Sequence, residues 1–265
     1  MKICMMTNTY LPHIGGVARS VHTFSKEYRK RGHEVLVVAP EFPKRDAVPA
    51  ETGVIRLPAI QQFNGSDFSV RLPISGMFNA QIDEFAADII HSHHPFLLGD
   101  TALRWAARKH VPIIFTHHTL YEEYTHYVPF DSPALKQFTI ELSTHYANLC
   151  DAVIAPSESI AKLIRQRGVE TPIEIIPTGV EVAEFAGGNG KKFRQQNKIL
   201  PGAFVVGHLG RLAPEKNLTY LSRAMALFLK KNPEAIFLIV GDGSAAEEIR
   251  AIFKKENLLK QLVMP

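Results

Sequence analysis

Short apolar segments alternate with helical patterns along this chain of 265 residues, and this alternation restricts the possible folds more than any other feature. Residues 2–7 are predicted to form a short buried strand, and 35–39 are uniformly apolar, as in strands that helices cover on both faces. Between them, apolar residues recur at the spacing of one helix face: Val17, Val21, Phe24 and Tyr28. Gly32 follows, where a helix would end. Strand, helix and strand in this order form a βαβ unit, which predicts a parallel sheet.

The same alternation continues to about residue 176. Further strands are predicted at 54–57, 88–91, 112–116, 152–155 and 173–176. The helix before the last of these is marked at both ends, with Ser157 as its N-cap, 158–167 as its body and Gly168 after it. The pattern predicts an α/β fold with a complete N-terminal Rossmann-like domain over residues 1–179.

A second α/β pattern begins after residue 200. It comprises a strand at 203–208, a helix at 218–230, a strand at 235–240, a helix at 245–256 and a last short strand at 262–264. Residues 180–200 are polar and rich in glycine and lack a persistent apolar stripe, so we expect an interdomain linker there. The second domain, 201–265, has about 65 residues, against the ~100 or more that are usual. We therefore predict a second Rossmann-like domain that is incomplete.

Composition and charge limit the partners of such a protein. The formal net charge is +4, and Lys and Arg are scattered among Asp and Glu, which is too weak a bias to indicate nucleic acid. It is compatible with an anionic substrate or an anionic membrane surface. Cys4 and Cys150 stand far apart in apolar surroundings, and no signal peptide or apolar run of ~18 residues is found. We expect a cytoplasmic protein with reduced thiols, and any membrane association to be peripheral, at the inner face.

The loop at 10–17 is the first candidate for ligand binding. It is expected at the carboxyl end of a parallel sheet, where ligands bind, and Gly15 and Gly16 let backbone amides approach a phosphate or a sugar. The alternative is an ordinary tight turn, which glycine pairs also mark. The dinucleotide fingerprint Gly-x-Gly-x-x-Gly is absent, which argues against a dehydrogenase.

Histidines follow two neighbouring predicted strands. His91, His93 and His94 stand at the end of one strand. His117 and His118 stand at the end of the next, so both groups are expected near the glycine loop. Alternation places His91 and His93 on one face of their strand, a spacing that also occurs in metal sites. No acidic residue stands beside the first group, which favours hydrogen bonding over metal binding. Two alternatives stay open: ordinary surface or core imidazoles, and a zinc hydrolase.

The third candidate is the loop 210–216, directly after the first strand of the second domain. It holds Arg211 and Lys216 just before a helix begins. Two cations there suit a diphosphate whose negative charge grows as it leaves. A solvated basic loop is the alternative. The segment 240–243, with glycines on both sides of Asp242, is interpreted as a turn.

Taken in order, these segments resemble the retaining glycosyltransferases of the glycosyl-transferase group 1 type. The matching motifs are 12–17 (PHIGGV), 88–93 (DIIHSH), 116–118 (THH), 155–157 (APS), 176–180 (IPTGV), 210–216 (GRLAPEK) and 240–243 (VGDG). Each motif is weak alone, and their order makes the resemblance specific over essentially the whole chain. It implies a GT-B fold, with two Rossmann-like domains, and transfer of a sugar from a nucleotide-sugar with retention of configuration.

The resemblance also implies roles for individual residues. Gly15 and Gly16 would lie near the donor phosphate and the acceptor, and His117 would be the catalytic residue that contacts the donor sugar. Arg211 and Lys216 would bind the diphosphate, most often that of a UDP-sugar. Further substrate contacts would be made by His93, His118, Tyr121, Thr178 and Gly210. No metal or other cofactor is expected, because the leaving diphosphate would be stabilised electrostatically by the protein.

The acceptor is expected to be a lipid or a carbohydrate. The segment 116–129 looks most like that of the bacterial diacylglycerol glucosyltransferases of this group. Residues expected to form a peripheral lipid-facing surface are Phe63, Phe68, Phe78 and Arg71.

Members of the group also carry a pair of glutamates, separated by seven residues, deeper in the second domain. The sequence ends at Pro265, before that motif would be reached, so we expect a truncated chain. Glu248 and Glu256 have the same spacing but follow the wrong strand, and they are interpreted as surface charges. The alternative function is a non-catalytic nucleotide- or sugar-binding module, or an inactive fragment.

Overall fold

The computed structural model describes residues 1–13, 15–41, 52–60, 70–71, 79–128 and 131–265. They form two compact units, Met1–Val180 (unit 1) and Glu181–Pro265 (unit 2). The residues expected to face lipid fall outside this description: Phe63, Phe68 and Phe78 entirely, and Arg71 for its side chain. None of the helices described has both the length and the apolar character needed to cross a membrane.

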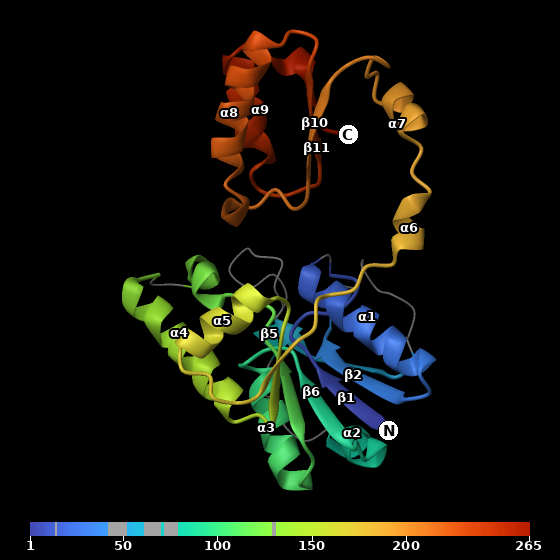
Figure 1. Ribbon diagram of the computed structural model, residues 1–265, viewed down its shortest axis with the longest axis vertical. Helices are drawn as coiled ribbons and strands as arrows, with labels where there is room; N and C mark the ends of the chain where they lie inside the picture. The colour runs from blue at the N-terminus through green and yellow to red at the C-terminus, as the bar shows by residue number, and fades with distance from the viewer. Residues whose placement is uncertain (14, 42–51, 61–69, 72–78, 129–130) are drawn as a thin grey trace. The chain divides into compact units, whose positions relative to one another are not determined.

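Unit 1 is built on a parallel sheet of seven strands in the order β3-β2-β1-β6-β7-β8-β9. Its strands β2, β1 and β6 are labelled in Figure 1. The strands are β1 (Lys2–Met6), β2 (Glu34–Pro40), β3 (Val54–Leu57), β6 (Ile89–Ser92), β7 (Ile113–Thr116), β8 (Ala152–Ala155) and β9 (Ile173–Ile175). Each coincides with a segment predicted from its apolar residues. Two more strands, β4 (Ala59–Ile60) and β5 (Val70–Arg71), pair antiparallel and are too short to show a periodic pattern.

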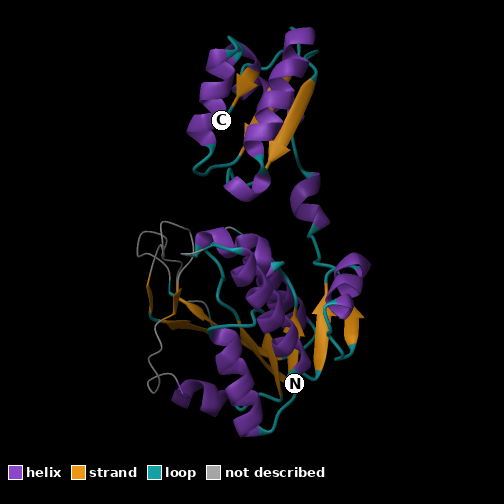
Figure 2. Cartoon of the chain, turned by 90° about the vertical axis from the view of Figure 1, so that its left-hand side faces the viewer, coloured by secondary structure: helices purple, strands orange, loops and turns teal. Residues whose placement is uncertain are grey.

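Helices cover both faces of this sheet (Figure 2). They are α1 (Gly16–Lys30), α2 (Asn79–Phe85), α3 (Leu98–Lys109), α4 (Pro133–Asn148) and α5 (Glu158–Gln166). Helix α1 packs on the face of β1 that carries Ile3 and Met5, whereas α3, α4 and α5 pack with Cys4 and Met6 on the other face. The face changes because right-handed crossovers put helices on opposite sides when the chain reverses its direction across the sheet.

Local sequence accounts for the ends of these helices. The Oγ of Ser157 accepts a hydrogen bond from Ile160 N at 3.3 Å and begins α5, as predicted. Gly168 has φ +99°, a left-handed conformation that suits the residue after a helix. In α4, Ser132 has the same capping role and accepts from Leu135 N at 3.2 Å.

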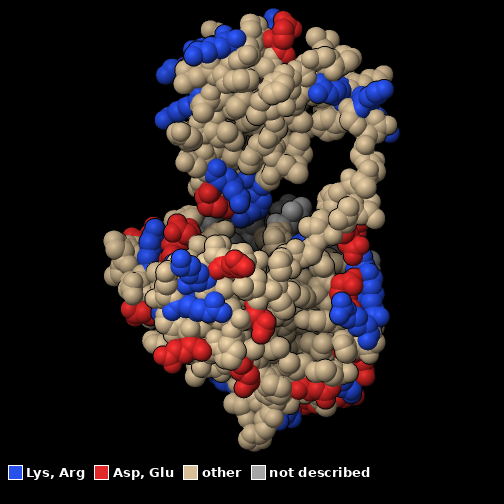
Figure 3. Space-filling view, in the orientation of Figure 1, with Lys and Arg blue, Asp and Glu red and all other residues tan. Residues whose placement is uncertain are grey.

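Both cysteines are buried and free. Burial raises the pKa of the Cys4 thiol and of the Cys150 thiol to about 12. The two thiols are therefore protonated and unreactive, and they pack within the core on the α3 side of the sheet. Charged side chains of both signs are interspersed over the face of unit 1 seen in Figure 3.

Unit 2 has a three-stranded parallel sheet in the order β10-β11-β12. Its elements are α6 (Val182–Ala186), α7 (Gly190–Gln196), β10 (Val205–Leu209), the 3-10 turn η4 (Pro214–Lys216), α8 (Leu218–Lys231), β11 (Ile236–Val240), α9 (Ala246–Lys255), the 3-10 turn η5 (Leu259–Gln261) and β12 (Leu262–Val263). Helices α8 and α9 pack against the sheet through a core that includes Phe237 and Phe253. The range 180–200, expected to be a linker, contains α6 and α7. Neither helix has a buried residue, and with five and seven residues they are too short to show a helical period in the sequence.

Candidate functional site

The strand order of the sheet in unit 1 indicates the edge of the sheet at which a ligand is expected, here called the ligand edge. From β1 the chain proceeds to β2 and β3 on one side, and later from β6 to β9 on the other. The reversal falls between β1 and β6, which pair directly. In open parallel sheets, ligands bind at the carboxyl ends of the strands at such a point. The loops after β1, β6 and β7 are therefore the part of unit 1 in which to look for a site.

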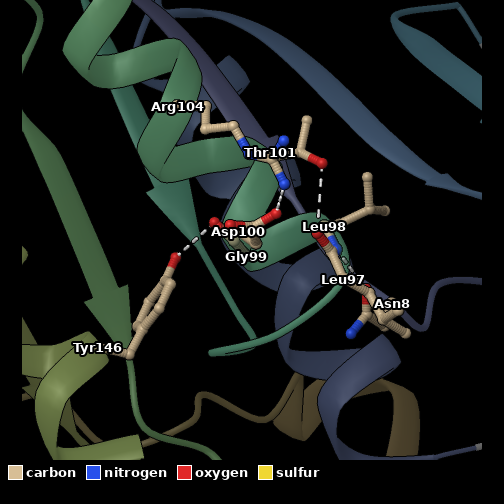
Figure 4. Close-up of polar contacts among 8 residues, drawn as sticks. All are labelled: Asn8, Leu97, Leu98, Gly99, Asp100, Thr101, Arg104 and Tyr146. Carbon is tan, nitrogen blue, oxygen red and sulfur yellow. Dashed lines mark hydrogen bonds and ion pairs between the residues drawn. The ribbon is translucent and has the colours of Figure 1, made fainter. Parts of the chain in front are cut away.

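Asn8 links the first two of these loops. Its backbone N–H donates to His94 Nδ1 at 3.1 Å, and its side-chain amide donates to the carbonyl oxygen of Phe96 at 3.0 Å. Its Oδ1 accepts from Leu98 N, the first residue of α3, at 3.1 Å (Figure 4). Asn8 thus caps a helix that begins 90 residues later in the chain. The sequence alone does not reveal this role of Asn8, because no local spacing relates residue 8 to residue 98.

The histidines after β6 and β7 form a buried cluster. His91 Nε2 and Thr116 Oγ1 share a hydrogen bond of 2.7 Å, and His93 Nδ1 shares one of 2.9 Å with His118 Nε2. The rings of His91 and His93 lie 4.1 Å apart between centroids, on one face of the strand as strand alternation predicts. Among the described residues, no group of three or more His, Cys, Asp or Glu side chains is arranged to hold a metal ion.

Burial keeps these imidazoles neutral. It lowers the pKa of His91 to about 4 and that of His94 to about 3. It also lowers the pKa of His93 and of His118 well below the usual value for histidine, with a smaller contribution from the neighbouring imidazoles. A neutral imidazole has one donor and one acceptor nitrogen, so the cluster can bind hydroxyl groups as either partner.

His117 begins the loop after β7 and lies between two aromatic rings. Its ring is 5.8 Å from that of Phe115 and 5.9 Å from that of Tyr121, between centroids, in edge-on arrangements. Its backbone N–H donates to Ile154 O at 2.9 Å, which ties the loop to β8. Burial lowers the pKa of His117 to about 4, so this residue is neutral as well.

Four buried polar atoms of these loops have no hydrogen-bond partner among the described residues. They are Thr9 Oγ1, His93 Nε2, His117 Nδ1 and the Tyr121 hydroxyl. An unsatisfied buried polar group costs about 1–3 kcal/mol, and native proteins contain few of them. Their position after β1, β6 and β7 is the expected ligand edge, and a polyhydroxylated ligand can supply the missing partners.

The glycine pair lies at the beginning of α1. Gly15 is the N-cap residue and has an extended backbone, and α1 begins at Gly16. A Cβ added at Gly16 would meet no atom within 4 Å, so the packing of this chain does not require a glycine there. Thr178 lies beside the same helix, with its Oγ1 3.5 Å from Ser20 Oγ. The N-terminus of α1 and the open space around Gly16 suit an anion that approaches this end of the helix.

In unit 2, the loops after β10 and β11 pack backbone against backbone. Gly210 N donates to Val240 O at 3.0 Å, and Leu212 N donates to Asp242 O at 2.8 Å. Gly241 has φ +150°, and a Cβ there would lie 1.9 Å from Gly210 O. The segment 240–243, interpreted as a turn, therefore also supports the loop that carries Arg211.

Arg211 and Lys216, the two residues expected to bind the diphosphate, lie in one loop of the structure, but their surroundings differ. Arg211 Nη2 forms an ion pair of 2.7 Å with Glu215 Oε1, so its charge is already balanced within the loop. Lys216 is exposed, at the end of η4. Glu248 accepts from Thr219 Oγ1 at 2.9 Å, and Glu256 pairs with Lys230, so both glutamates join α9 to α8 at the surface.

Comparison with known proteins identifies the family. Residues 14–184 match the family described as glycosyltransferase family 4, and this match covers more than half of the chain. The chain belongs to glycosyltransferase family 4. Residues 189–265 match the family described as glycosyl transferases group 1, the group that the sequence motifs resemble.

Curated relatives of this family 4 member act on different sugars. It is 30% identical over 267 residues to the alpha-monoglucosyldiacylglycerol synthase of Streptococcus pneumoniae, a match that covers 94% of this chain and 58% of the relative. It is 26% identical to the GDP-mannose-dependent alpha-mannosyltransferase of Mycobacterium tuberculosis, over 92% of this chain and 63% of the relative. The chain thus spans about three fifths of the length of these relatives.

Solved structures confirm the predicted fold class. The crystal structure of Anabaena Alr3699/HepE in complex with UDP and glucose covers 100% of this chain, and the chain covers 68% of it. The TM-score is 0.71 at 20% sequence identity, a likeness that shows the fold alone. This family 4 member has the GT-B fold, with a seven-stranded parallel sheet in unit 1 and a smaller parallel sheet in unit 2.

Proposed function

We propose that this family 4 glycosyltransferase, at its full length, transfers a hexose from a UDP-sugar to a lipid or carbohydrate acceptor with retention of configuration. The observation that carries the proposal is the set of four unsatisfied polar atoms at the carboxyl end of β1, β6 and β7. Sugar hydroxyls both donate and accept hydrogen bonds, as neutral imidazoles and a tyrosine hydroxyl do. Two named relatives, a monoglucosyldiacylglycerol synthase and a mannosyltransferase, support a hexose as the transferred group.

The residues of unit 1 would bind and orient the sugar. His117 Nδ1 is assigned to a hydroxyl of the donor sugar, and His93 Nε2 and the Tyr121 hydroxyl to further hydroxyls. His118 would orient His93 through the hydrogen bond that their rings share. The amides at Gly15 and Gly16 are assigned to a phosphate oxygen, because the N-terminus of α1 favours negative charge.

In unit 2, Lys216 and Arg211 are assigned to the diphosphate of the donor, and Gly210 to the turn that presents them. Negative charge accumulates on the diphosphate as its bond to the anomeric carbon of the donor sugar breaks. Fixed cations stabilise this charge more in the transition state than in the ground state. Arg211 would exchange its contact with Glu215 for a phosphate. We propose that no metal takes part. Thr178 is also assigned to the substrate, because it lies beside α1, whose N-terminus is assigned to the phosphate.

Replacing the cations is expected to weaken nucleotide binding. We expect Lys216→Ala to raise the dissociation constant for UDP about tenfold, which corresponds to the loss of one charge-assisted contact. Arg211→Ala is expected to have a larger effect, because the Glu215 carboxylate then faces the phosphates without the guanidinium. Isothermal titration calorimetry with UDP on the 265-residue chain measures both. Lys254→Ala, which removes an exposed cation of α9, is the matched control.

An unchanged affinity in the Arg211 variant would remove this residue from the site. The donor is identified by titrating UDP-glucose and GDP-mannose in parallel, because the relatives use different sugars. Transfer is then assayed with the full-length protein, with diacylglycerol in anionic phospholipid vesicles and with soluble sugars as acceptors. Retention is read from the anomeric configuration of the product. Binding of UDP-glucose without hydrolysis or transfer would assign the alternative, a non-catalytic binding module.

A further inference from the structure

A largely buried ion pair links the loop after β7 to the end of α5. Arg167 Nη2 lies 2.5 Å from Glu122 Oε1, and the two side chains are 18% and 8% exposed. Glu122 belongs to the 3-10 helix η3 (Tyr121–Tyr127), whereas Arg167 is the C-cap residue of α5, where a cation is favoured by the helix dipole. The partners are 45 residues apart in the sequence, and no local pattern pairs them.

Stability alone does not account for this pair. Moving two charges out of water costs several kcal/mol per ion, and replacing a buried pair by apolar residues is often neutral or stabilising. The pair is also incompletely satisfied, because Arg167 Nη1 is buried and has no partner among the described residues. The pair therefore contributes little net stability, and what it does must be sought in the groups beside it.

The pair adjoins the residues assigned to the sugar. Glu122 directly follows Tyr121, whose ring contacts those of His117 and Phe96, with centroids 5.9 Å and 5.2 Å away. Both charges act on His117: the guanidinium lowers the pKa of its imidazole and the carboxylate raises it, in addition to the larger effect of burial. The two influences have opposite signs and therefore offset each other in part, the guanidinium having the larger effect.

The other groups near His117 carry no charge that could replace this balance. They are His118, Tyr121 and the neighbouring imidazoles His91, His93 and His94. Burial keeps the imidazoles neutral, and it raises the pKa of the Tyr121 hydroxyl far above its usual value. Glu122 and Arg167 are therefore the charged groups that set the electrostatic environment of His117 within the described part of unit 1.

We propose that Glu122 and Arg167 are positioning residues for His117. The ion pair holds η3, and with it the Tyr121 ring, against the imidazole. Burial keeps His117 neutral, and the ion pair balances the charge beside the imidazole, so that the ring stays in place as a hydrogen-bond partner for a sugar hydroxyl. The last step rests on the proposed function; the effect on His117 itself does not.

The direct test is an NMR titration of His117 in the 265-residue chain, in which the nitrogen shifts of the ring are followed against pH. Arg167→Met removes the cation and leaves the carboxylate, so the pKa of His117 should rise by about one unit or more. Arg167→Lys keeps the charge and should restore a value close to that of the parent. Glu122→Gln should leave the pKa of His117 at or below that of the parent. Glu123→Gln and Arg165→Met, which change exposed neighbours, are the matched controls.

Two outcomes would overturn the proposal. One is a folded Arg167→Met variant in which the pKa of His117 does not move. The other is a shift in the same direction in Arg167→Met and Glu122→Gln, which a merely structural role would produce. Because Arg167→Met leaves a buried carboxylate and risks unfolding, the double variant Glu122→Gln/Arg167→Met provides a second test. It should fold and keep the His117 pKa of the parent, yet bind UDP-glucose about tenfold more weakly, since the tie to η3 is lost.

Calorimetry with UDP-glucose separates this inference from the function on which it rests. If the parent binds UDP-glucose and the double variant binds it equally well, the positioning role is wrong. If His117 titrates as expected in all variants but neither the 265-residue chain nor the full-length protein binds UDP-glucose, the electrostatic role stands and the proposed sugar site fails.

Discussion

Gly99→Ala is expected to destabilise unit 1 by about 4 kcal/mol or more, a loss found only where a substitution cannot be accommodated. A Cβ at this position would lie 1.8 Å from His94 O and 2.8 Å from His94 C, both backbone atoms. Hydrogen bonds of Tyr146 hinder the shift of α3 away from His94 that would make room for the Cβ. The Tyr146 hydroxyl lies 3.0 Å from Gly99 O (Figure 4). The same hydroxyl donates to Ser92 Oγ at 2.6 Å. The glycine thus allows α3 to begin directly against the loop after β6.

The loss is measured by urea denaturation followed through the fluorescence of Trp105, the single tryptophan of the chain, which lies in α3. Gly16→Ala is the matched control, because its Cβ would meet no atom and alanine is favoured over glycine within a helix by about 0.5–1 kcal/mol. The control should be as stable as the parent or slightly more stable. Equal unfolding midpoints for Gly99→Ala and the parent would show that α3 can move away from His94.

Acidification is expected to unfold unit 1 between about pH 5 and pH 4. The folded protein holds five imidazoles neutral by burial, with a pKa of about 4 for His91 and His117, about 3 for His94, and well below the usual value for His93 and His118. In the unfolded chain each has a pKa of about 6.5 and binds a proton first. Stability is therefore full above about pH 6.5 and falls as the pH drops toward the folded values.

The size of this effect follows from the same values. A histidine whose pKa falls from about 6.5 to about 4 on folding contributes about 3 kcal/mol less stability once the pH is below both. Several such groups together approach the whole free energy of unfolding of a typical domain, ~5–15 kcal/mol. Because the cluster lies at the ligand edge, a bound sugar would have to be released in the same pH range.

The pH dependence is measured by urea denaturation at pH 7 and pH 5.5, with Trp105 fluorescence as the signal. His91→Gln removes one of the titrating groups, so the difference in stability between the two pH values should shrink by about 1 kcal/mol. His145→Gln, which changes an exposed histidine of α4, should leave that difference unchanged. If the His91 variant shows the same pH dependence as the parent, burial of His91 does not oppose its protonation.

Local sequence determined where the strands and helices lie and which side chains share a strand face. Strand alternation correctly placed His91 and His93 on one face. Ser157 before α5 and Gly168 after it correctly located the two ends of that helix. These features depend on residues a few positions apart, for which backbone geometry sets a fixed period or a fixed cap. The alternation of strands and helices likewise leads to a parallel sheet, because right-handed crossovers leave few other arrangements.

Only the tertiary structure decided which side chains complete the site. Asn8 caps a helix 90 residues away, and Glu122 pairs with Arg167 across 45 residues. Gly99 is required by the approach of the His94 carbonyl and not by its own backbone angles. Such contacts follow from how elements pack, and packing brings together atoms that share no period, spacing or local conformation in the chain.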